Sequence, residues 1–360
     1  MKRFAPLVLI PLLTLLIASA AGEGWLRHTC AYCTWNERNR NLYVSPYEPT
    51  YYSWYHLRTP NQSESYPTSD FDIELTTNSL GVRDIEHPLP KAPGEIRIIG
   101  LGDSFTEGQG AEFEDGYLKV VERRLSELCG EPVRMIIGGV SGSDPWYSYT
   151  LLRDKLMPFQ PDIVMLAINN SDVYDIGVRG GRERFLPDGG VRYRDPPAAE
   201  RLFRYSHLFR FVTMRILGYD WYGVSPTMRS MTQSQAVEDL KAAVLAFREL
   251  AEQHGFRFLI VAHPTMHEIQ NREYGLGFKP FLSWLATQDS PWVDIMPRML
   301  DSVDRAQISD YFWEHDFHNT ARGYRLLGDE VIRGLIETGM VNPPSPTGSR
   351  CGLAAATAAP

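Results

Sequence analysis

The sequence predicts an α/β fold with a parallel sheet of about five strands and helices on both faces. Two observations support this prediction. Between residues 95 and 340, short aliphatic runs alternate with longer amphipathic stretches. The aliphatic runs are apolar at consecutive positions, not at every second one. This pattern is typical of strands that are covered on both faces, as in a parallel sheet.

Five apolar runs are the predicted strands, and three longer stretches are predicted helices. In the first helix Leu118, Val121, Leu125 and Leu128 recur at helical spacing, and Gly130 follows as a stop signal. The other two helices show the same apolar periodicity. The strands are expected at 96–101, 133–139, 162–169, 256–264 and 292–297, and the helices at 116–130, 234–255 and 321–339.

The first 22 residues predict a signal peptide or a membrane anchor. Lys2 and Arg3 precede an uncharged apolar run from Phe4 to Ala21, which contains an Ala-x-Ala pattern at Ala18. Its length is at the lower limit for crossing a bilayer, so both alternatives stay open. Either one implies export to a periplasmic or extracellular location.

Three further regions lie outside the regular alternation. Residues 23–94 form an aromatic-rich extension, with a strand and turn expected around 71–79. Within the α/β domain predicted at 95–340, residues 178–231 are predicted to form an insertion, either a lid over the strand ends or additional packing. Residues 341–360 are rich in Pro, Gly, Ser and Ala and predict a disordered tail.

The cysteines and the charge limit the classes of function. Cys30 and Cys33 form a C-x-x-C pair with no second pair nearby, which favours a local disulfide over a zinc site. Cys129 ends a predicted helix and is expected to pack in the core. The net charge of −8 argues against a nucleic-acid partner. The group His263, His267 and Glu268 lacks a metal-binding spacing, so no metal is expected.

A short polar turn follows the first strand and reads Gly102-Asp103-Ser104. A serine at the carboxyl end of a parallel strand lies where α/β proteins bind ligands. The stretch GDSFTEGQG resembles the first motif of the SGNH, or GDSL, hydrolase family. The resemblance implies a flavodoxin-like sheet, an esterase, lipase or acyltransferase activity, no cofactor, and Ser104 as nucleophile and backbone oxyanion donor.

Three later segments extend the resemblance. In VSGSDPW, Gly142 matches the glycine whose N–H binds the oxyanion. In LAINNSD, Asp172 is aligned with the aspartate of the family motif. Asn170, or alternatively Ser171, is then the candidate side-chain donor to the oxyanion. In WEHDFHNT, Asp316 and His318 match the acid and base of a triad. The two lie two positions apart, although three is usual in the family, and Glu314 is a weaker alternative acid.

The resemblance implies an exported serine hydrolase. It would cleave an ester, an O-acetyl or short acyl group on a carbohydrate or lipid, through an acyl-serine intermediate. One alternative is an O-acyltransferase acting on an envelope or exopolysaccharide glycan. Another is a non-catalytic glycan-binding protein with the same fold.

Overall fold

The computed structural model describes residues 5–33, 43–44, 57–186, 200–219, 225–342 and 353. Its centre is a five-stranded parallel sheet with the strand order β6-β5-β7-β8-β9. The predicted α/β fold with a parallel sheet is therefore confirmed, and each strand overlaps an expected apolar run. The strands are β5 (Ile96–Gly102), β6 (Val133–Gly139), β7 (Ile163–Ile168), β8 (Arg257–Ala262) and β9 (Trp292–Asp294).

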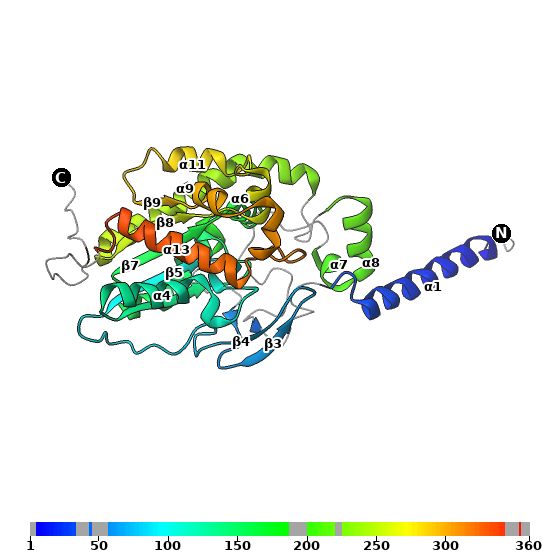
Figure 1. Ribbon diagram of the computed structural model, residues 1–360. Coiled ribbons are helices and arrows are strands. Elements are labelled where there is room, and N and C mark those ends of the chain that lie inside the picture. Colours follow the sequence, from blue (N-terminus) through cyan, green and yellow to red (C-terminus); the bar gives the residue numbers. More distant parts are fainter. Residues whose placement is uncertain are drawn as a thin grey trace.

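Helices cover both faces of the sheet (Figure 1). On one face α4 (Tyr117–Cys129) packs against α13 (Ala321–Glu337). On the other face α5 (Pro145–Leu151), α6 (Asn170–Arg179) and α9 (Pro226–His254) pack together. Every residue of β5 and β7 is buried, as the consecutive apolar positions of these strands require. Shorter helices complete the two layers: α11 (Lys279–Leu285) contacts α9, and α12 (Met296–Ser302) contacts α13 and α10 (Met266–Asn271).

The N-terminal extension contributes a hairpin that packs against the α/β domain. Strand β3 (Ser63–Pro67) pairs antiparallel with β4 (Asp72–Thr76), and β4 overlaps the expected strand. Their buried face packs against the indole of Trp313, in the loop before α13. A second pair, β1 (Tyr43–Val44) with β2 (Leu57–Arg58), precedes it. Most of the aromatic segment lies outside the described residues.

Two buried arginines connect this extension to the segment that follows β5. Arg58 forms a bidentate ion pair with Glu107, at 2.7 and 2.8 Å, and both side chains are buried. Arg83 donates to the carbonyl oxygens of Gly108 and Ala111, at 2.7 and 2.8 Å. The extension thus makes charged hydrogen bonds to the residues that directly follow Ser104.

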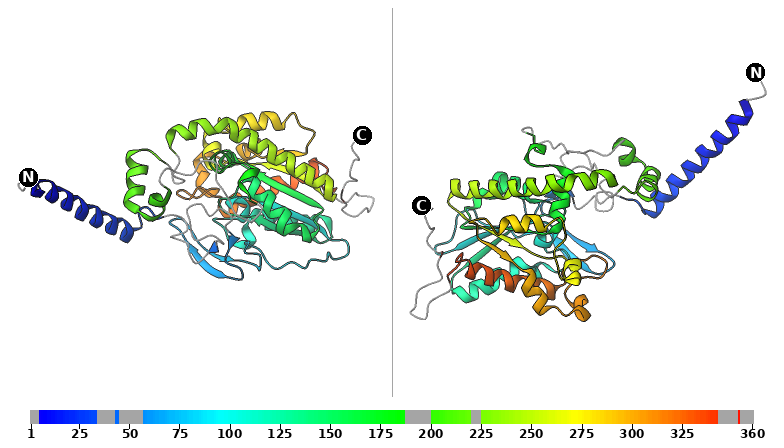
Figure 2. Two further views of the ribbon diagram at one scale, coloured as in Figure 1. Left: turned by 180° about the vertical axis from the view of Figure 1, so that it is seen from behind. Right: turned by 90° about the horizontal axis from the view of Figure 1, so that it is seen from above.

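The described residues of the predicted insertion at 178–231 include a small helical unit at one end of the sheet (Figures 1 and 2). It contains a 3-10 turn (Arg182–Arg184), α7 (Glu200–Tyr205), α8 (His207–Phe211) and a π-helical turn (Val212–Ile216) that continues α8. Helix α9 begins at Pro226, inside the expected insertion. The tail from residue 343 onward lies almost entirely outside the described residues.

The N-terminal apolar run forms one long helix, α1 (Ala5–Thr29), which projects away from the domain (Figure 1). Residues Leu9–Thr29 are long and apolar enough to cross a membrane, judged by length and composition alone. Cys30 and Cys33 form the expected local disulfide directly after this helix. Cys129 is buried in the hydrophobic core, as expected, and it is also disulfide-bonded.

Candidate active site

A tight turn at the carboxyl end of β5 presents Ser104. Gly102 adopts φ 154°, and a Cβ there would lie 2.3 Å from Thr106 Oγ1, so a larger residue does not fit. Asp103 then caps the short helix α3 (Ser104–Glu107) by accepting a 2.9 Å hydrogen bond from the Phe105 N–H. The strand end and the cap together fix where the Ser104 hydroxyl lies.

The structure brings Ser104, His318 and Asp316 into one hydrogen-bonded chain. His318 Nε2 lies 2.6 Å from Ser104 Oγ, and His318 Nδ1 lies 2.5 Å from Asp316 Oδ1. The Phe105 ring lies against the imidazole, with ring centroids 4.6 Å apart. This geometry lets the imidazole accept the hydroxyl proton while the carboxylate fixes its tautomer.

The residue between Asp316 and His318 adopts a left-handed backbone conformation, which accounts for their short spacing in the sequence. Phe317, which lies between Asp316 and His318, has φ 68°, a conformation that is rare for a bulky side chain. A hydrogen bond closes the loop that contains Phe317: the Trp313 N–H donates to the His318 carbonyl at 2.9 Å. The sharp turn lets side chains two positions apart point toward each other.

Asp70, in the β3–β4 turn, holds the loop that carries this pair. Its carboxylate accepts from the N–H groups of His315, at 2.8 Å, and Asp316, at 2.7 Å, and it lies 2.7 Å from His315 Nδ1. This hydrogen bond and the Asp70 charge raise the pKa of His315. The local sequence gives no signal for the role of Asp70, because its partners lie about 245 positions away.

Gln109 connects the acid to the second loop of the site. Its Nε2 donates to Asp316 Oδ2 at 3.1 Å, and its Oε1 accepts from the Ser141 hydroxyl at 3.3 Å. The Gln109 side chain is largely buried, and the backbone carbonyl of Gln109 accepts from the buried Tyr324 hydroxyl at 2.7 Å. Sequence reasoning missed this residue, although it lies in the same GDSFTEGQG stretch as Ser104.

Gly142 lies in the loop after β6, where the resemblance placed an oxyanion donor. Its φ is 71°, and its carbonyl accepts a 2.6 Å hydrogen bond from Arg179. Buried Asp144 anchors Arg179 and Arg184. Burial opposes ionisation of Asp144, but the two guanidinium charges outweigh it and lower its pKa. The Gly142 loop is thus fixed by a buried charge cluster.

After β7, the structure directs Asn169 toward the serine turn instead of Asn170. Asn169 Nδ2 donates to Asp103 Oδ2 at 2.9 Å. The predicted Asn170 side chain packs against Gly275, where an added Cβ would lie 2.6 Å from its Oδ1. The other candidate, Ser171, donates its hydroxyl to Asn169 Oδ1 at 2.8 Å.

The shift by one residue has a local cause. Asn169 is the N-cap of α6 and forms a capping box with Asp172, which accepts from the Asn169 N–H at 2.8 Å. Asp172, the residue used for the alignment, is therefore a helix-capping residue. The Asn-x-x-Asp spacing directly after the strand is the signal that identifies Asn169 as the residue at the strand end.

Two buried titratable groups surround Asn169. Burial raises the pKa of Asp172 well above its usual range, and the nearby Asp103 charge adds to this effect. Burial lowers the pKa of His263, whose Nε2 lies 3.4 Å from Asn169 Nδ2. The uncharged forms of both groups are thus favoured. Among the described residues, no group of three His, Cys, Asp or Glu side chains could hold a metal ion.

Comparisons with known proteins give the family. A sequence model of the GDSL-like lipase/acylhydrolase family matches residues 101–326, more than half of the chain. That range contains Ser104, Gly142, Asn169, Asp316 and His318. No curated protein matches the chain.

Several solved structures are similar in fold. One is a two-domain esterase active on acetylated mannans, at 12% identity over 70% of this chain and 52% of that chain, with a TM-score of 0.41. The chain thus spans about half the length of that esterase. A lipase/acylhydrolase from Enterococcus faecalis matches at 14% identity over 69% of this chain and 99% of that chain, with a TM-score of 0.41.

A third is an acetyl-xylooligosaccharide esterase from Geobacillus, at 13% identity over 67% of this chain and 94% of that chain, with a TM-score of 0.41. With identities of 12–14% and TM-scores of 0.41, these solved structures carry no information about the activity of this chain. The family assignment depends on the sequence match. On that match, this chain belongs to the GDSL-like lipase/acylhydrolase family.

Proposed function

We propose that the chain is an exported serine esterase that removes a short acyl group, such as an O-acetyl group, from a carbohydrate or lipid alcohol. The observation that carries this proposal is the hydrogen-bonded chain from Asp316 through His318 to Ser104. An acyl-Ser104 intermediate is the route that such a chain supports.

In the first half-reaction Ser104 Oγ attacks the ester carbonyl carbon while His318 Nε2 takes the hydroxyl proton. The carbonyl π electrons move to the oxygen. When the tetrahedral adduct collapses, the bond to the alkoxy oxygen breaks and His318 protonates the leaving alcohol. Asp316 stabilises the imidazolium that forms between these two events. In the second half-reaction water repeats the attack, which releases the carboxylic acid and restores Ser104.

The negative charge on the carbonyl oxygen needs donors that are already in position. Ser104 is the first residue of α3, so its N–H has no partner within the helix. The Gly142 N–H is the second proposed donor. Asn169 is the third: its amide has two N–H bonds, and one of them serves Asp103. Asn169 takes the role that the sequence suggested for Asn170 or Ser171.

Export is supported by the N-terminal segment and by the disulfide. Lys2 and Arg3 precede the apolar run, which favours retention of that end in the cytoplasm and translocation of the rest. The Cys30–Cys33 disulfide on the far side of the run suits an oxidising compartment. Both observations are compatible with a cleaved signal peptide and with a retained anchor.

The chemistry can be tested with a serine-directed fluorophosphonate and a series of p-nitrophenyl esters from acetate to decanoate. The wild-type chain should be labelled and should hydrolyse acetate with the highest kcat/KM. Ser104→Ala should lose both the labelling and the hydrolysis. Ser141→Ala, a nearby serine outside the triad, should keep the labelling. Equal labelling of the wild-type chain and Ser104→Ala would overturn the assignment of the nucleophile.

The acyl acceptor separates an esterase from an acyltransferase. In the presence of an acetyl donor and a soluble oligosaccharide, the esterase proposal predicts free acetate as the product. Acetylated sugar formed faster than free acetate would instead identify a glycan O-acyltransferase that uses the same serine.

A further inference from the structure

Helix α1 does not leave the domain as a free tail, because its last turns dock on the α7–α8 unit. The carboxylate of Glu23 accepts from the Ser206 hydroxyl, at 2.9 Å, and from the N–H groups of His207, at 3.1 Å, and Leu208, at 2.7 Å. A side chain of α1 thus satisfies the first N–H groups of α8. Arg27, one turn further along, donates to the Tyr205 carbonyl.

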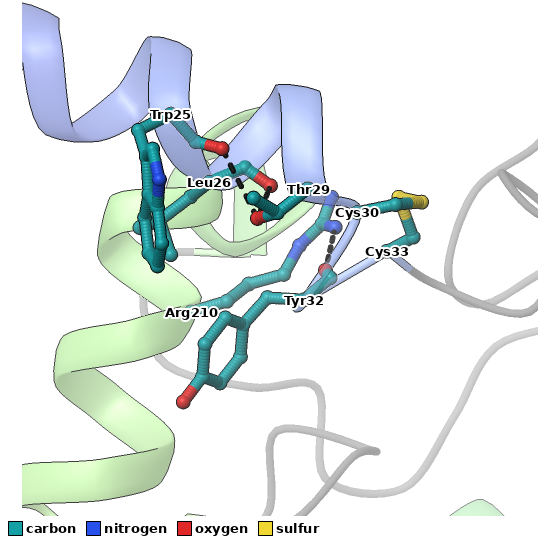
Figure 3. The surroundings of a disulfide bond; sticks show 7 residues. All are labelled: Trp25, Leu26, Thr29, Cys30, Tyr32, Cys33 and Arg210. Atoms are coloured by element: carbon teal, nitrogen blue, oxygen red, sulfur yellow. Dashed lines mark hydrogen bonds between the residues drawn. A yellow bond between two sulfur atoms is a disulfide. The ribbon is translucent and has the colours of Figure 1, made fainter.

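A buried arginine fixes the turn that follows α1 (Figure 3). Arg210, on α8, is 1% exposed and donates to the carbonyls of Tyr32, at 2.6 Å, and Phe203, at 2.7 Å. The Tyr32 ring packs edge-on against Phe211, and the Cys30–Cys33 disulfide closes the same turn. The base of α1 and the α7–α8 unit are therefore in firm contact.

The contact between α1 and the α7–α8 unit begins where the uncharged apolar run of α1 ends. The uncharged run ends at Ala21, and a Cβ on the next residue, Gly22, would lie 3.8 Å from Leu208. At 1.5 Å per residue the preceding 18 residues span about 27 Å, close to the thickness of a bilayer core. Trp25, just past the run, is 63% exposed, as is typical of an aromatic residue at a membrane interface.

The α7–α8 unit, to which the base of α1 is hydrogen-bonded, carries an exposed apolar surface. Apolar side chains protrude from three consecutive elements, and Ile216 is 67% and Leu217 54% exposed. Figure 1 shows α8 beside the base of α1, on the side of the molecule from which α1 departs. We call this surface the α7–α8 face; it consists of Leu202, Tyr205, Phe211, Ile216 and Leu217.

We propose that α1 is retained as a membrane anchor and that the α7–α8 face rests on the phospholipid bilayer that α1 crosses. A bilayer is the occupant that the position of the face favours, because the face is continuous with the base of a helix whose apolar side chains are exposed along its length. Arg27 and Arg215 are both exposed, and they donate to the Tyr205 carbonyl and the Tyr32 hydroxyl, respectively. Their positive charges suit the phosphate groups of lipids.

The proposal also orients the catalytic domain. Helix α9 runs from the α7–α8 unit to the opposite end of the molecule, and β8 returns from there (Figures 1 and 2). The carboxyl ends of the parallel strands, and with them Ser104, therefore lie on the side nearer to the bilayer. Esters carried close to the membrane surface would reach the serine most readily. This inference depends on the proposed export and not on the proposed chemistry.

The test uses the full chain reconstituted into vesicles of phosphatidylethanolamine and phosphatidylglycerol. Ile216→Cys and Leu217→Cys are each labelled with the environment-sensitive dye NBD. Leu89→Cys is the matched control: Leu89 is 52% exposed, and its carbonyl accepts from Arg97 near the amino end of β5, away from the carboxyl ends of the strands. Among the described residues there are no free cysteines, so labelling is directed to the introduced thiol.

The expected result is a blue-shifted NBD emission at positions 216 and 217 that lipids with a shallow doxyl group quench. The label at position 89 should instead be quenched by aqueous iodide. Equal behaviour at all three positions would overturn the proposal. So would shifts that appear in native membranes but not in pure lipid, which would identify a protein occupant.

Two further measurements keep the outcomes separate. The intact mass of the membrane-bound protein should include residues 1–22, and a mature chain that begins after Ala20 would contradict the retained anchor. The same NBD shifts should appear in the Ser104→Ala background. A failure of the esterase chemistry would therefore leave this readout unchanged, and a failure of membrane docking would leave phosphonate labelling unchanged.

Discussion

The carboxylate of Asp70 accepts a 2.7 Å hydrogen bond from the backbone N–H of Asp316, so a turn in the N-terminal extension holds the loop of the proposed catalytic acid. Only 7% of the Asp70 side chain is exposed, and its three contacts all go to residues 315 and 316. The acid is thus oriented from two sides, by Asp70 through the backbone and by Gln109 through the side chain.

Replacing Asp70 should lower the rate without removing the nucleophile. Asp70→Ala frees two backbone N–H groups, and the loop that carries Asp316 and His318 loses its fixed position. Displacements of about 1 Å in a site of this kind cost up to roughly 100-fold in rate. We expect kcat to fall by about 10- to 100-fold. The phosphonate should still label Ser104, but at a lower rate.

The matched control is Asp72→Ala, which removes an exposed carboxylate from the same hairpin. It should leave kcat close to the wild-type value. If both variants behave alike in steady-state assays, Asp70 has no positioning role.

The choice between Asn169 and Asn170 can be tested with serine substitutions. Asn169→Ser keeps an N-cap oxygen for α6 but removes the amide donor. Loss of one oxyanion donor costs about 100- to 1,000-fold in kcat, and we expect a fall of that size with little change in KM. Asn170→Ser should remain close to wild type. A large loss of kcat in Asn170→Ser alone would restore the original sequence alignment.

The buried pair of Arg58 and Glu107 should dominate the stability of the contact between the extension and the catalytic domain. Arg58→Met leaves a buried carboxylate without its bidentate partner, which costs about 3–5 kcal/mol. Urea unfolding monitored by tryptophan fluorescence would measure the change. The double variant Arg58→Met/Glu107→Leu should recover part of the loss, because it leaves no unpaired charge.

An exposed pair provides the comparison. Arg322 and Asp310 are about half exposed, and Arg322→Met should cost less than about 1 kcal/mol. A loss in Arg58→Met no larger than that would show that the buried pair does not hold the extension in place.

His315 should make stability depend on pH. Its hydrogen bond to Asp70, and then the charge of Asp70, raise its pKa in the folded state. A raised pKa means that protonated His315 stabilises the fold. This contribution is complete below its unfolded pKa, about 6.5, and is lost as the pH rises through the folded value.

Thermal unfolding can measure this effect. His315→Gln should lower Tm at pH 5.5 and change it little at pH 9. His254→Gln, at the exposed end of α9, should change Tm little at either pH. A difference between His315→Gln and wild type that grows with pH would contradict the assignment.

The sheet can be predicted from the sequence because each of its strands is an uninterrupted apolar run. Helices α4, α9 and α13 can likewise be predicted, because their apolar residues recur with the period of a helix. Shorter helices such as α5 and α11 are missed because seven residues give too few turns for a period to appear. Strand β3, with the sequence SESYP, is mostly polar, and its structure depends on pairing with β4.

The proposed catalytic residues can be found in the sequence because they lie in short motifs that keep their order. Asp70 and Gln109 cannot be found in that way. Their contacts with the acid join segments about 245 and 207 positions apart, and only the folded chain brings them together. Asn169 lies between these two cases. Its capping box with Asp172 is a local sequence signal, but it is overlooked when Asp172 is aligned with the aspartate of the family motif.

The contacts made by Arg58, Arg83 and Asp70 bear on how the protein can be divided. Residues 101–326 are shared with the family, but these three side chains lie before that range and bond to residues inside it. A fragment cut to the shared range would leave Glu107 buried without a counter-ion and the 315–316 backbone without its acceptor. The smallest part of the chain that folds on its own is therefore larger than residues 101–326, the range shared with the family.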